Sequence, residues 1–293
     1  MSALRHGATA TAPTLRVEPV SGFIGAEIGG VDLKQPLSSP AREQLRRALN
    51  EHLVLFFRDQ HLSLDEQKRL TEVYGPLNRV PYVAPLPDDP NVIAVLKEAD
   101  ETNVGVFGGE WHSDFSFLEQ PPAGSILNAV AVPPYGGDTL WASQVAAYET
   151  LPETLREIAD THQAVHTGAP YGAKYPPANH ERAGRSIRMT RGDPEADREV
   201  LKPIVRVHPE TGRKALFVNP IYTTRIDGMS AADSAATLRR IYRHCTRPDL
   251  TCRHRWRPGD IVVWDNRATL HYALNDYDGH RRLLYRTTFA DRV

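Results

Sequence analysis

The sequence predicts a mostly β fold with flanking helices, a β-sandwich or jelly roll. Short apolar segments follow one another through the second half of the chain, separated by turn dipeptides such as Pro258-Gly259 and Asp278-Gly279. A single helical pattern interrupts this series. Many short strands with few helices are typical of closed or two-layered β architectures, so we expect a binding site in the mouth of the sandwich.

Local patterns place the elements of the first half. Strands are expected at 15–20, 23–28, 53–57 and 91–96. Pro40 begins a helix whose apolar residues keep helical spacing to residue 49. Ser63, with Glu66 in the capping-box position, begins a second helix that Gly75 ends. We interpret these elements as scaffold.

The second half is divided in the same way. Strands are expected at 123–132, 139–141, 250–256, 260–264 and 282–289, with a hairpin formed by 204–208 and 214–219. Helical spacing occurs over 145–148, 155–158 and 231–244, and Ser230 is the N-cap of the last of these. His208 begins the turn of the hairpin, and we interpret it as a turn residue, not a ligand.

Two segments fall outside this pattern. Residues 1–13 are rich in Ala and Thr without an apolar core, so we expect a disordered tail before one domain at 14–293. Residues 167–199 carry many Gly, Pro and charged residues over more positions than loops usually have. This segment is either a lid over a site or a disordered excursion, and we favour a lid-like insertion.

Composition limits the partners. The formal net charge is −1, and the basic residues are spread along the chain, so we expect neither a nucleic acid nor a membrane partner. Cys245 and Cys252 are too few for a disulfide framework, and no stretch approaches the roughly 20 apolar residues of a membrane helix. We therefore expect a soluble cytoplasmic protein, and a homo-oligomer stays open.

The most informative motif is His112-Ser113-Asp114, within an aromatic run that we expect to be a strand. Positions i and i+2 of a strand face the same side, so both side chains could hold one metal ion. His271, which follows the apolar run 261–264, is the best third ligand. Two histidines and one carboxylate with three open positions are typical of non-haem Fe(II) oxygenases, whereas zinc prefers a tetrahedral site. A histidine that bonds a nearby carboxylate is the simpler alternative.

A second signal lies in the last strand. Arg282 and Arg286 share strand parity, so both could face the cavity that contains His271. A buried arginine needs an anionic partner, and a small dicarboxylate would supply one through bidentate hydrogen bonds. Surface salt bridges are the alternative for either arginine.

From about residue 17 to residue 289 the chain resembles the taurine dioxygenase and 2,4-dichlorophenoxyacetate dioxygenase (TauD/TfdA) family of Fe(II)- and 2-oxoglutarate-dependent enzymes. The resemblance is carried by Trp111-His112-Ser113-Asp114, Pro121-Pro122-Ala123-Gly124, residues 136–141, residues 208–212 and Trp264-Asp265-Asn266-Arg267 through His271 to Arg286. It is similar to the aryloxyalkanoate-cleaving branch in residues 216–219, Tyr222, residues 225–229 and Cys252-Arg253. The resemblance implies the double-stranded β-helix, the cupin-like form of the jelly roll.

The resemblance also implies roles for single residues. His112, Asp114 and His271 would hold Fe(II), and Thr139 and Arg282 would bind the far carboxylate of 2-oxoglutarate. Arg286 would lie near this co-substrate and hold an anionic group of the primary substrate. O2 would take the last iron position, 2-oxoglutarate would be decarboxylated to succinate and CO2, and a C–H bond would be hydroxylated.

The chain departs from the taurine enzymes where the substrate binds. Val80 and Gly108 stand where those enzymes place a histidine and an asparagine. This loss of polar groups favours a larger, less polar anion, of the sulfonate, sulfate ester or aryloxyalkanoate type. Tyr222 is either an aromatic wall or a core residue. A catalytically silent β-barrel that binds a small anion is the alternative function, and a zinc hydrolase is a weaker third.

Overall fold

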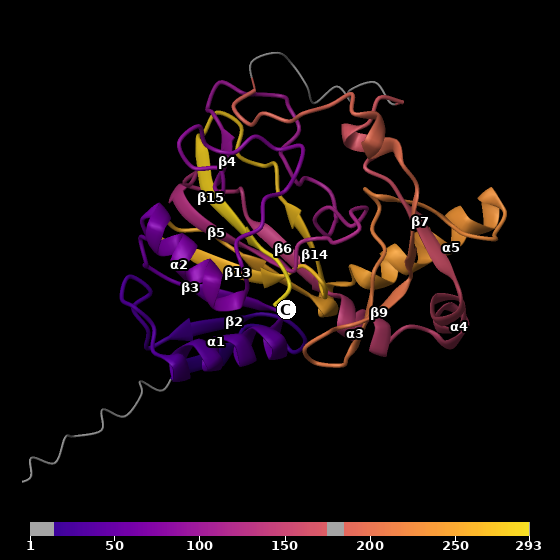
Figure 1. Ribbon diagram of the computed structural model, residues 1–293, viewed down its shortest axis with the longest axis horizontal. Helices are drawn as coiled ribbons and strands as arrows, with labels where there is room; N and C mark the ends of the chain where they lie inside the picture. Colours follow the sequence, from indigo (N-terminus) through magenta and orange to yellow (C-terminus); the bar gives the residue numbers. More distant parts are fainter. Residues whose placement is uncertain (1–14, 175–184, 293) are drawn as a thin grey trace, which may run out of the picture.

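The computed structural model describes residues 15–174 and 185–292, and the mostly β jelly roll is confirmed: two sheets pack on one another (Figure 1). The larger sheet has the order β1-β2-β3-β13-β5-β15-β4. Its strands are β1 (Arg16–Pro19), β2 (Ala26–Gly29), β3 (Val54–Phe57), β4 (Ile93–Lys97), β5 (Gly124–Ala131), β13 (Ile261–Asp265) and β15 (Arg282–Phe289). The smaller sheet, β12-β6-β14, consists of β6 (Thr139–Ser143), β12 (Thr251–His254) and β14 (Thr269–Ala273).

Strand register separates two faces of the larger sheet. Residues that alternate along a strand point to opposite faces, and cross-strand partners share a face. Phe56 of β3 therefore points inward on the same face as Trp264 of β13, and both belong to one buried cluster with Trp141 of the smaller sheet. The rings of Trp141 and Trp264 lie 6.1 Å apart, which joins the two sheets.

The opposite face of the larger sheet packs against α1 (Ser39–His52) and α2 (Leu64–Tyr74) (Figure 1). Ser38 caps α1 in place of the expected start at Pro40, because its hydroxyl accepts the backbone N–H of Ala41. The capping box of α2 is confirmed: Ser63 and Glu66 bond each other's backbone N–H groups. Gly75 ends this helix, as expected.

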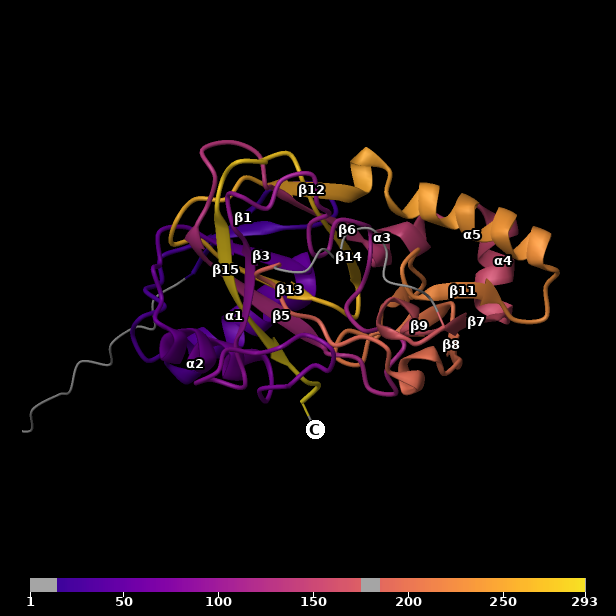
Figure 2. The same cartoon turned by 90° about the horizontal axis from the view of Figure 1, so that it is seen from above.

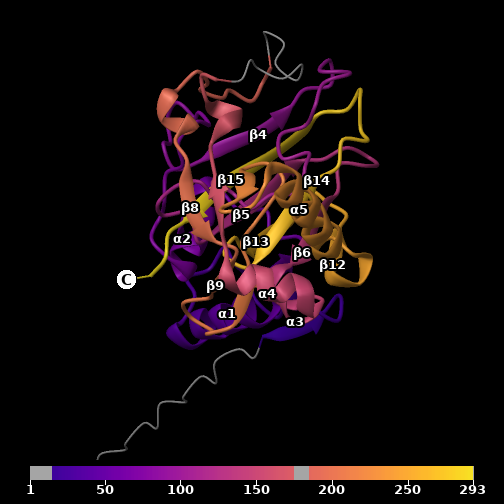
Figure 3. The same ribbon diagram turned by 90° about the vertical axis from the view of Figure 1, so that its right-hand side faces the viewer.

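The outer face of the smaller sheet is covered by α3 (Gln144–Glu149) and α5 (Ala231–Cys245), with α4 (Glu153–Thr161) beside them. Figure 3 shows these three helices on one side of the molecule. Two small sheets lie at the same end, on the side of the molecule away from α2 (Figure 2). They consist of β7 (Gln163–His166), β8 (Val200–Pro203) and β11 (Thr223–Ile226), and of the expected hairpin β9 (Val205–Val207) and β10 (Lys214–Leu216).

The lid-like insertion is described in part. Residues 175–184 lie outside the described residues, as does the expected tail at 1–13. On either side of the gap the chain forms two short 3-10 turns, Ala169–Tyr171 and Pro194–Asp197, and Met189 forms a bridge with Val83. Tyr171 packs in the cluster that contains Phe115. None of the helices in the described part of the chain is long and apolar enough to span a bilayer.

Candidate active site

The structure brings His112, Asp114 and His271 together at the open end between the sheets, and all three are buried. One donor atom from each residue lies within 4.8 Å of the other two. Asp114 Oδ1 is 3.7 Å from His112 Nε2 and 3.8 Å from His271 Nε2. Backbone hydrogen bonds in both directions between His112 and His271 place the two rings side by side, because they pair His112 with the edge of β14 that does not face β6.

The protonation of these groups suits metal binding. His112 Nδ1 lies 2.7 Å from the backbone carbonyl of Glu110. A carbonyl oxygen only accepts, so Nδ1 carries the proton and Nε2 keeps its lone pair. Burial lowers the pKa of both His112 and His271, which favours neutral imidazoles. Burial opposes ionisation of Asp114, but Arg286 and the two histidines outweigh it and lower the pKa of the carboxyl.

The expected strand around His112 and Asp114 is wrong. Only His112 pairs with a strand, and residues 114–117 form turns in which Phe115 has a φ of 49°. The backbone of Asp114 bonds the side chain of Asn266 in place of a neighbouring strand. The aromatic residues of this segment do not share one face. Trp111 packs against the buried cluster under α5, whereas Phe115 and Phe117 belong to the cluster that contains Tyr171. The two side chains converge through this turn and not through strand parity.

Arg286 and Arg282 share a face of β15, as expected, and both are buried. Arg286 Nη2 donates to Asp114 Oδ2 at 2.6 Å and to Ser125 Oγ at 3.0 Å. Its Nε has no hydrogen-bond partner among the described residues. Arg286 therefore holds the carboxylate of Asp114 and retains a free donor.

Arg282 lies four residues away and contacts a different set of residues. Its Nε donates to the carbonyl of Gly137 at 3.1 Å, and its Nη2 approaches Thr139 Oγ1 at 3.5 Å. Rings of Trp256 and Tyr277 flank the guanidinium. Burial lowers the pKa of Arg282, and no carboxylate of the described residues forms an ion pair with it. A buried guanidinium in this state fits an incoming carboxylate.

The residues expected at the substrate side lie in two places. Gly108 is beside the cluster of His112, Asp114 and His271, because a Cβ at this position would lie 3.2 Å from His112 Cε1. Tyr222 and the half-buried Val80 join the aromatic cluster of Phe115 and Phe117. The hydroxyl of Tyr222 lies 3.3 Å from that of Tyr171. Tyr222 is thus buried in an aromatic cluster next to the turn that holds Asp114.

Other polar residues of the site were not predicted from the sequence. Ser125 bonds Arg286, Trp256 Nε1 donates to Thr139 Oγ1, and Asn266 bonds the backbone of Asp114. Asn128, also in β5, lies on the other face of the sheet, where it bonds the carbonyl of Leu62. Ser125 could have been predicted as a polar residue of an otherwise apolar strand. No local sequence pattern indicates Trp256 or Asn266.

A jelly roll that joins two imidazoles and a carboxylate near a buried arginine is typical of metal-dependent oxygenases. The family model for the taurine catabolism dioxygenase TauD, TfdA family matches residues 16–288, and the chain belongs to this family. It is accordingly a 2-oxoglutarate (alpha-ketoglutarate)-dependent dioxygenase, an oxidoreductase.

Similar proteins cover nearly the whole chain. The alpha-ketoglutarate-dependent sulfate ester dioxygenase of Pseudomonas putida is 40% identical, over 99% of this chain and 95% of that protein. An alkylsulfatase of Acinetobacter baylyi is 38% identical, over 95% and 86%. The alpha-ketoglutarate-dependent 2,4-dichlorophenoxyacetate dioxygenase of Cupriavidus pinatubonensis is 32% identical, over 94% and 98%.

Solved structures agree with the fold. A taurine dioxygenase from Burkholderia xenovorans superposes with a TM-score of 0.79 at 33% identity, over 96% of this chain and 92% of that one. AAD-2 in complex with Mn(II) and N-oxalylglycine superposes with a TM-score of 0.74 at 26% identity, over 96% and 98%.

Proposed function

We propose that the protein is an Fe(II)- and 2-oxoglutarate-dependent dioxygenase that hydroxylates a C–H bond of a small anionic organic substrate, with sulfate esters as the favoured class. The observation that carries the proposal is the buried convergence of His112, Asp114 and His271. Two relatives, at 40% and 38% identity, are named for sulfate esters and alkyl sulfates, and the aryloxyalkanoate enzyme is less similar at 32%. The AAD-2 structure supports a divalent metal and a small dicarboxylate analogue in this fold.

In this proposal the side chains of His112, Asp114 and His271 would hold the metal. His112 would bind through Nε2, since its Nδ1 proton is engaged by Glu110. Asp114 would bind through Oδ1, because Oδ2 already accepts from Arg286. When bound, the ferrous ion supplies activation of O2 coupled to decarboxylation of 2-oxoglutarate to succinate and CO2. Neutral imidazoles and an ionised carboxylate are the donor set that this ion requires.

Arg282 and Thr139 would bind the far carboxylate of 2-oxoglutarate. Thr139 Oγ1 already accepts from Trp256 Nε1 at 3.0 Å and lies near Arg282 Nη2. Two donors directed at one hydroxyl oxygen leave its own proton to be donated to an anion. Trp256 and Tyr277 shield the guanidinium from water on either side, which strengthens its interaction with a carboxylate.

Arg286 would hold the anionic group of the primary substrate with the donor that Asp114 and Ser125 leave free. The apolar side chain of Val80 and the absence of a side chain at Gly108 leave room for a larger and less polar molecule than taurine. Hydroxylation of the carbon that bears a sulfate oxygen gives an unstable product. Its C–O bond breaks, and an aldehyde and sulfate are released.

The proposal is tested by succinate formation from the purified chain with added Fe(II), 2-oxoglutarate and oxygen. We expect hexyl sulfate to stimulate succinate formation more than taurine or phenoxyacetate. His112→Ala and Asp114→Ala should abolish turnover because each removes a metal ligand, while His52→Ala, outside the site, should retain it. Turnover that survives in His112→Ala or Asp114→Ala would refute the metal assignment, and a preference for taurine would refute the substrate class.

A further inference from the structure

A single amide side chain holds both backbone polar groups of Asp114. The N–H of Asp114 donates to Asn266 Oδ1 at 2.7 Å, and Asn266 Nδ2 donates to the carbonyl of Asp114 at 3.0 Å. The same Nδ2 donates to the carbonyl of Pro122 at 3.0 Å. Asn266 is buried, so these contacts are shielded from water. Its amide bonds the N–H and C=O of Asp114 as the backbone of a neighbouring strand would.

The turn that follows Asp114 requires such support. Phe115 has a φ of 49° and is almost completely buried. A bulky side chain rarely adopts this conformation, which costs on the order of 1–3 kcal/mol unless the surroundings impose it. The paired hydrogen bonds from Asn266 oppose relaxation of the turn. Relaxation would rotate the Asp114 carboxylate away from His112 and His271.

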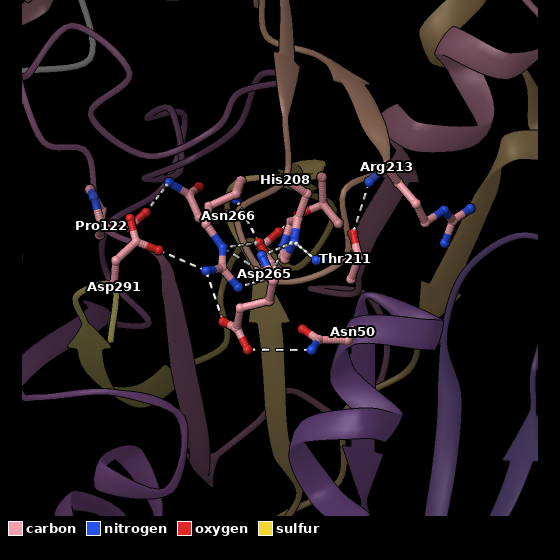
Figure 4. A network of polar contacts seen from close by, with 11 residues as sticks. Asn50, Pro122, His208, Thr211, Arg213, Asp265, Asn266 and Asp291 are labelled. Atoms are coloured by element: carbon pink, nitrogen blue, oxygen red, sulfur yellow. Dashed lines mark hydrogen bonds and ion pairs between the residues drawn. The ribbon is translucent and has the colours of Figure 1, made fainter. Parts of the chain in front are cut away.

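Asn266 is itself anchored at the end of β13. Its N–H donates to the carbonyl of Ala123, and the preceding residue, Asp265, is buried between His208 and Arg267. His208 Nε2 lies 2.9 Å from Asp265 Oδ2, and Arg267 Nη2 lies 2.6 Å from the same oxygen. Figure 4 shows Asn266 next to Asp265 and His208, with Pro122 and Asp291 at one side. Asn266 therefore lies in the turn directly after β13, next to a buried ion pair.

We propose that Asn266 is a positioning residue for the metal centre: by clasping the backbone of Asp114 it fixes the direction of the carboxylate between His112 and His271. This inference rests on the proposed metal site. Among the described residues, the Asn266 side chain makes no hydrogen bond to the imidazoles of His112 and His271 or to Arg286, so it acts through the backbone of Asp114. Residues that orient metal ligands in this way typically change metal affinity by about 10–100-fold when they are lost.

The test is a titration of the metal-free full chain with Mn(II), in the parent and in Asn266→Ala. Binding is measured by electron paramagnetic resonance. Asn128→Ala is the matched control, because Asn128 is also buried and bonded to a backbone carbonyl but lies on the opposite face of the larger sheet. Thermal unfolding is measured on the same samples. If Asn266→Ala does not give folded protein, Asn266→Ser is titrated in its place and judged by the same result.

We expect the Asn266 variant to bind Mn(II) at least tenfold more weakly than the parent. The Mn(II) affinity of the Asn128 variant should stay within twofold of the parent value, even if this variant is less stable. Parent-like Mn(II) affinity in the Asn266 variant would overturn the positioning role and leave the proposed metal site intact. A parent chain that binds no Mn(II) would overturn both. An equal loss of affinity in both variants would also overturn the role, since it would indicate a general effect of lost stability.

Discussion

At the scale of single residues, burial determines what each charge can do. Arg286 is neutralised by Asp114 at 2.6 Å, whereas Arg282 is equally buried and, among the described residues, has only the neutral groups of Gly137 and Thr139 as hydrogen-bond partners. An uncompensated buried cation is costly, so a ligand that carries a carboxylate lowers the free energy of the complex. The two arginines of one strand therefore differ: Arg286 pairs with an internal acid and keeps one free donor, whereas Arg282 has no acidic partner among the described residues.

This difference predicts the effect of Arg282→Ala. Charge-assisted hydrogen bonds contribute about 1.5–3 kcal/mol each, and 1.4 kcal/mol corresponds to a tenfold change. We expect the KM for 2-oxoglutarate to rise about 10–100-fold in steady-state assays of succinate formation. Arg281→Ala is the control, because Arg281 is exposed and pairs with Glu98. A KM that stays at the parent value in Arg282→Ala would rule out this arginine as the carboxylate anchor.

At the scale of elements, α2 supports the strand that carries both arginines. Gln67 Nε2 donates to the carbonyl of Tyr285 at 3.0 Å, and the hydroxyls of Thr71 and Thr287 lie 2.7 Å apart. These contacts lie on the outer face of β15, opposite to Arg282 and Arg286. The helix thus stabilises the strand without entering the site.

The capping box of α2 gives a prediction at this scale. Ser63→Ala removes the acceptor for the backbone N–H of Glu66, and loss of such a cap costs about 1 kcal/mol. We expect the free energy of unfolding, measured with urea, to fall by about that amount while the KM for 2-oxoglutarate stays unchanged. Glu66→Gln keeps an oxygen that accepts from Ser63 and should be nearly neutral. An equal loss in both variants would argue against the capping box.

At the scale of the whole molecule, buried neutral histidines tie stability to pH. Burial lowers the pKa of His166 to about 4 from an ordinary value near 6.5, with Lys202 adding to the effect. The unfolded chain therefore binds more protons than the folded one between these two values. The stabilisation is complete above pH 6.5 and is lost as the pH falls toward 4.

His166→Asn should flatten this dependence. From the shifted pKa, His166 accounts for about 2 kcal/mol of the fall in unfolding free energy between pH 7.5 and pH 5. We expect the fall, measured by urea unfolding at both pH values, to be smaller by about this amount in His166→Asn. His61→Asn is the control, because His61 is exposed and asparagine tolerates its positive φ. An unchanged dependence in His166→Asn would show that this histidine is not protonated on unfolding.

The sequence by itself determined the elements and the candidate residues. Caps, turn dipeptides and apolar spacing act between residues a few positions apart, so they placed α2 and β15 and put Arg282 and Arg286 on one face. The roles of His112, Asp114, His271 and the arginines stay predictions, although the structure brings these side chains together. Only the tertiary structure decided that Asp114 lies in a turn, that Arg286 pairs with it and that Asn266 clasps it. Those contacts join residues more than 150 positions apart, and they depend on which strands pair, which the local spacing of side chains does not encode.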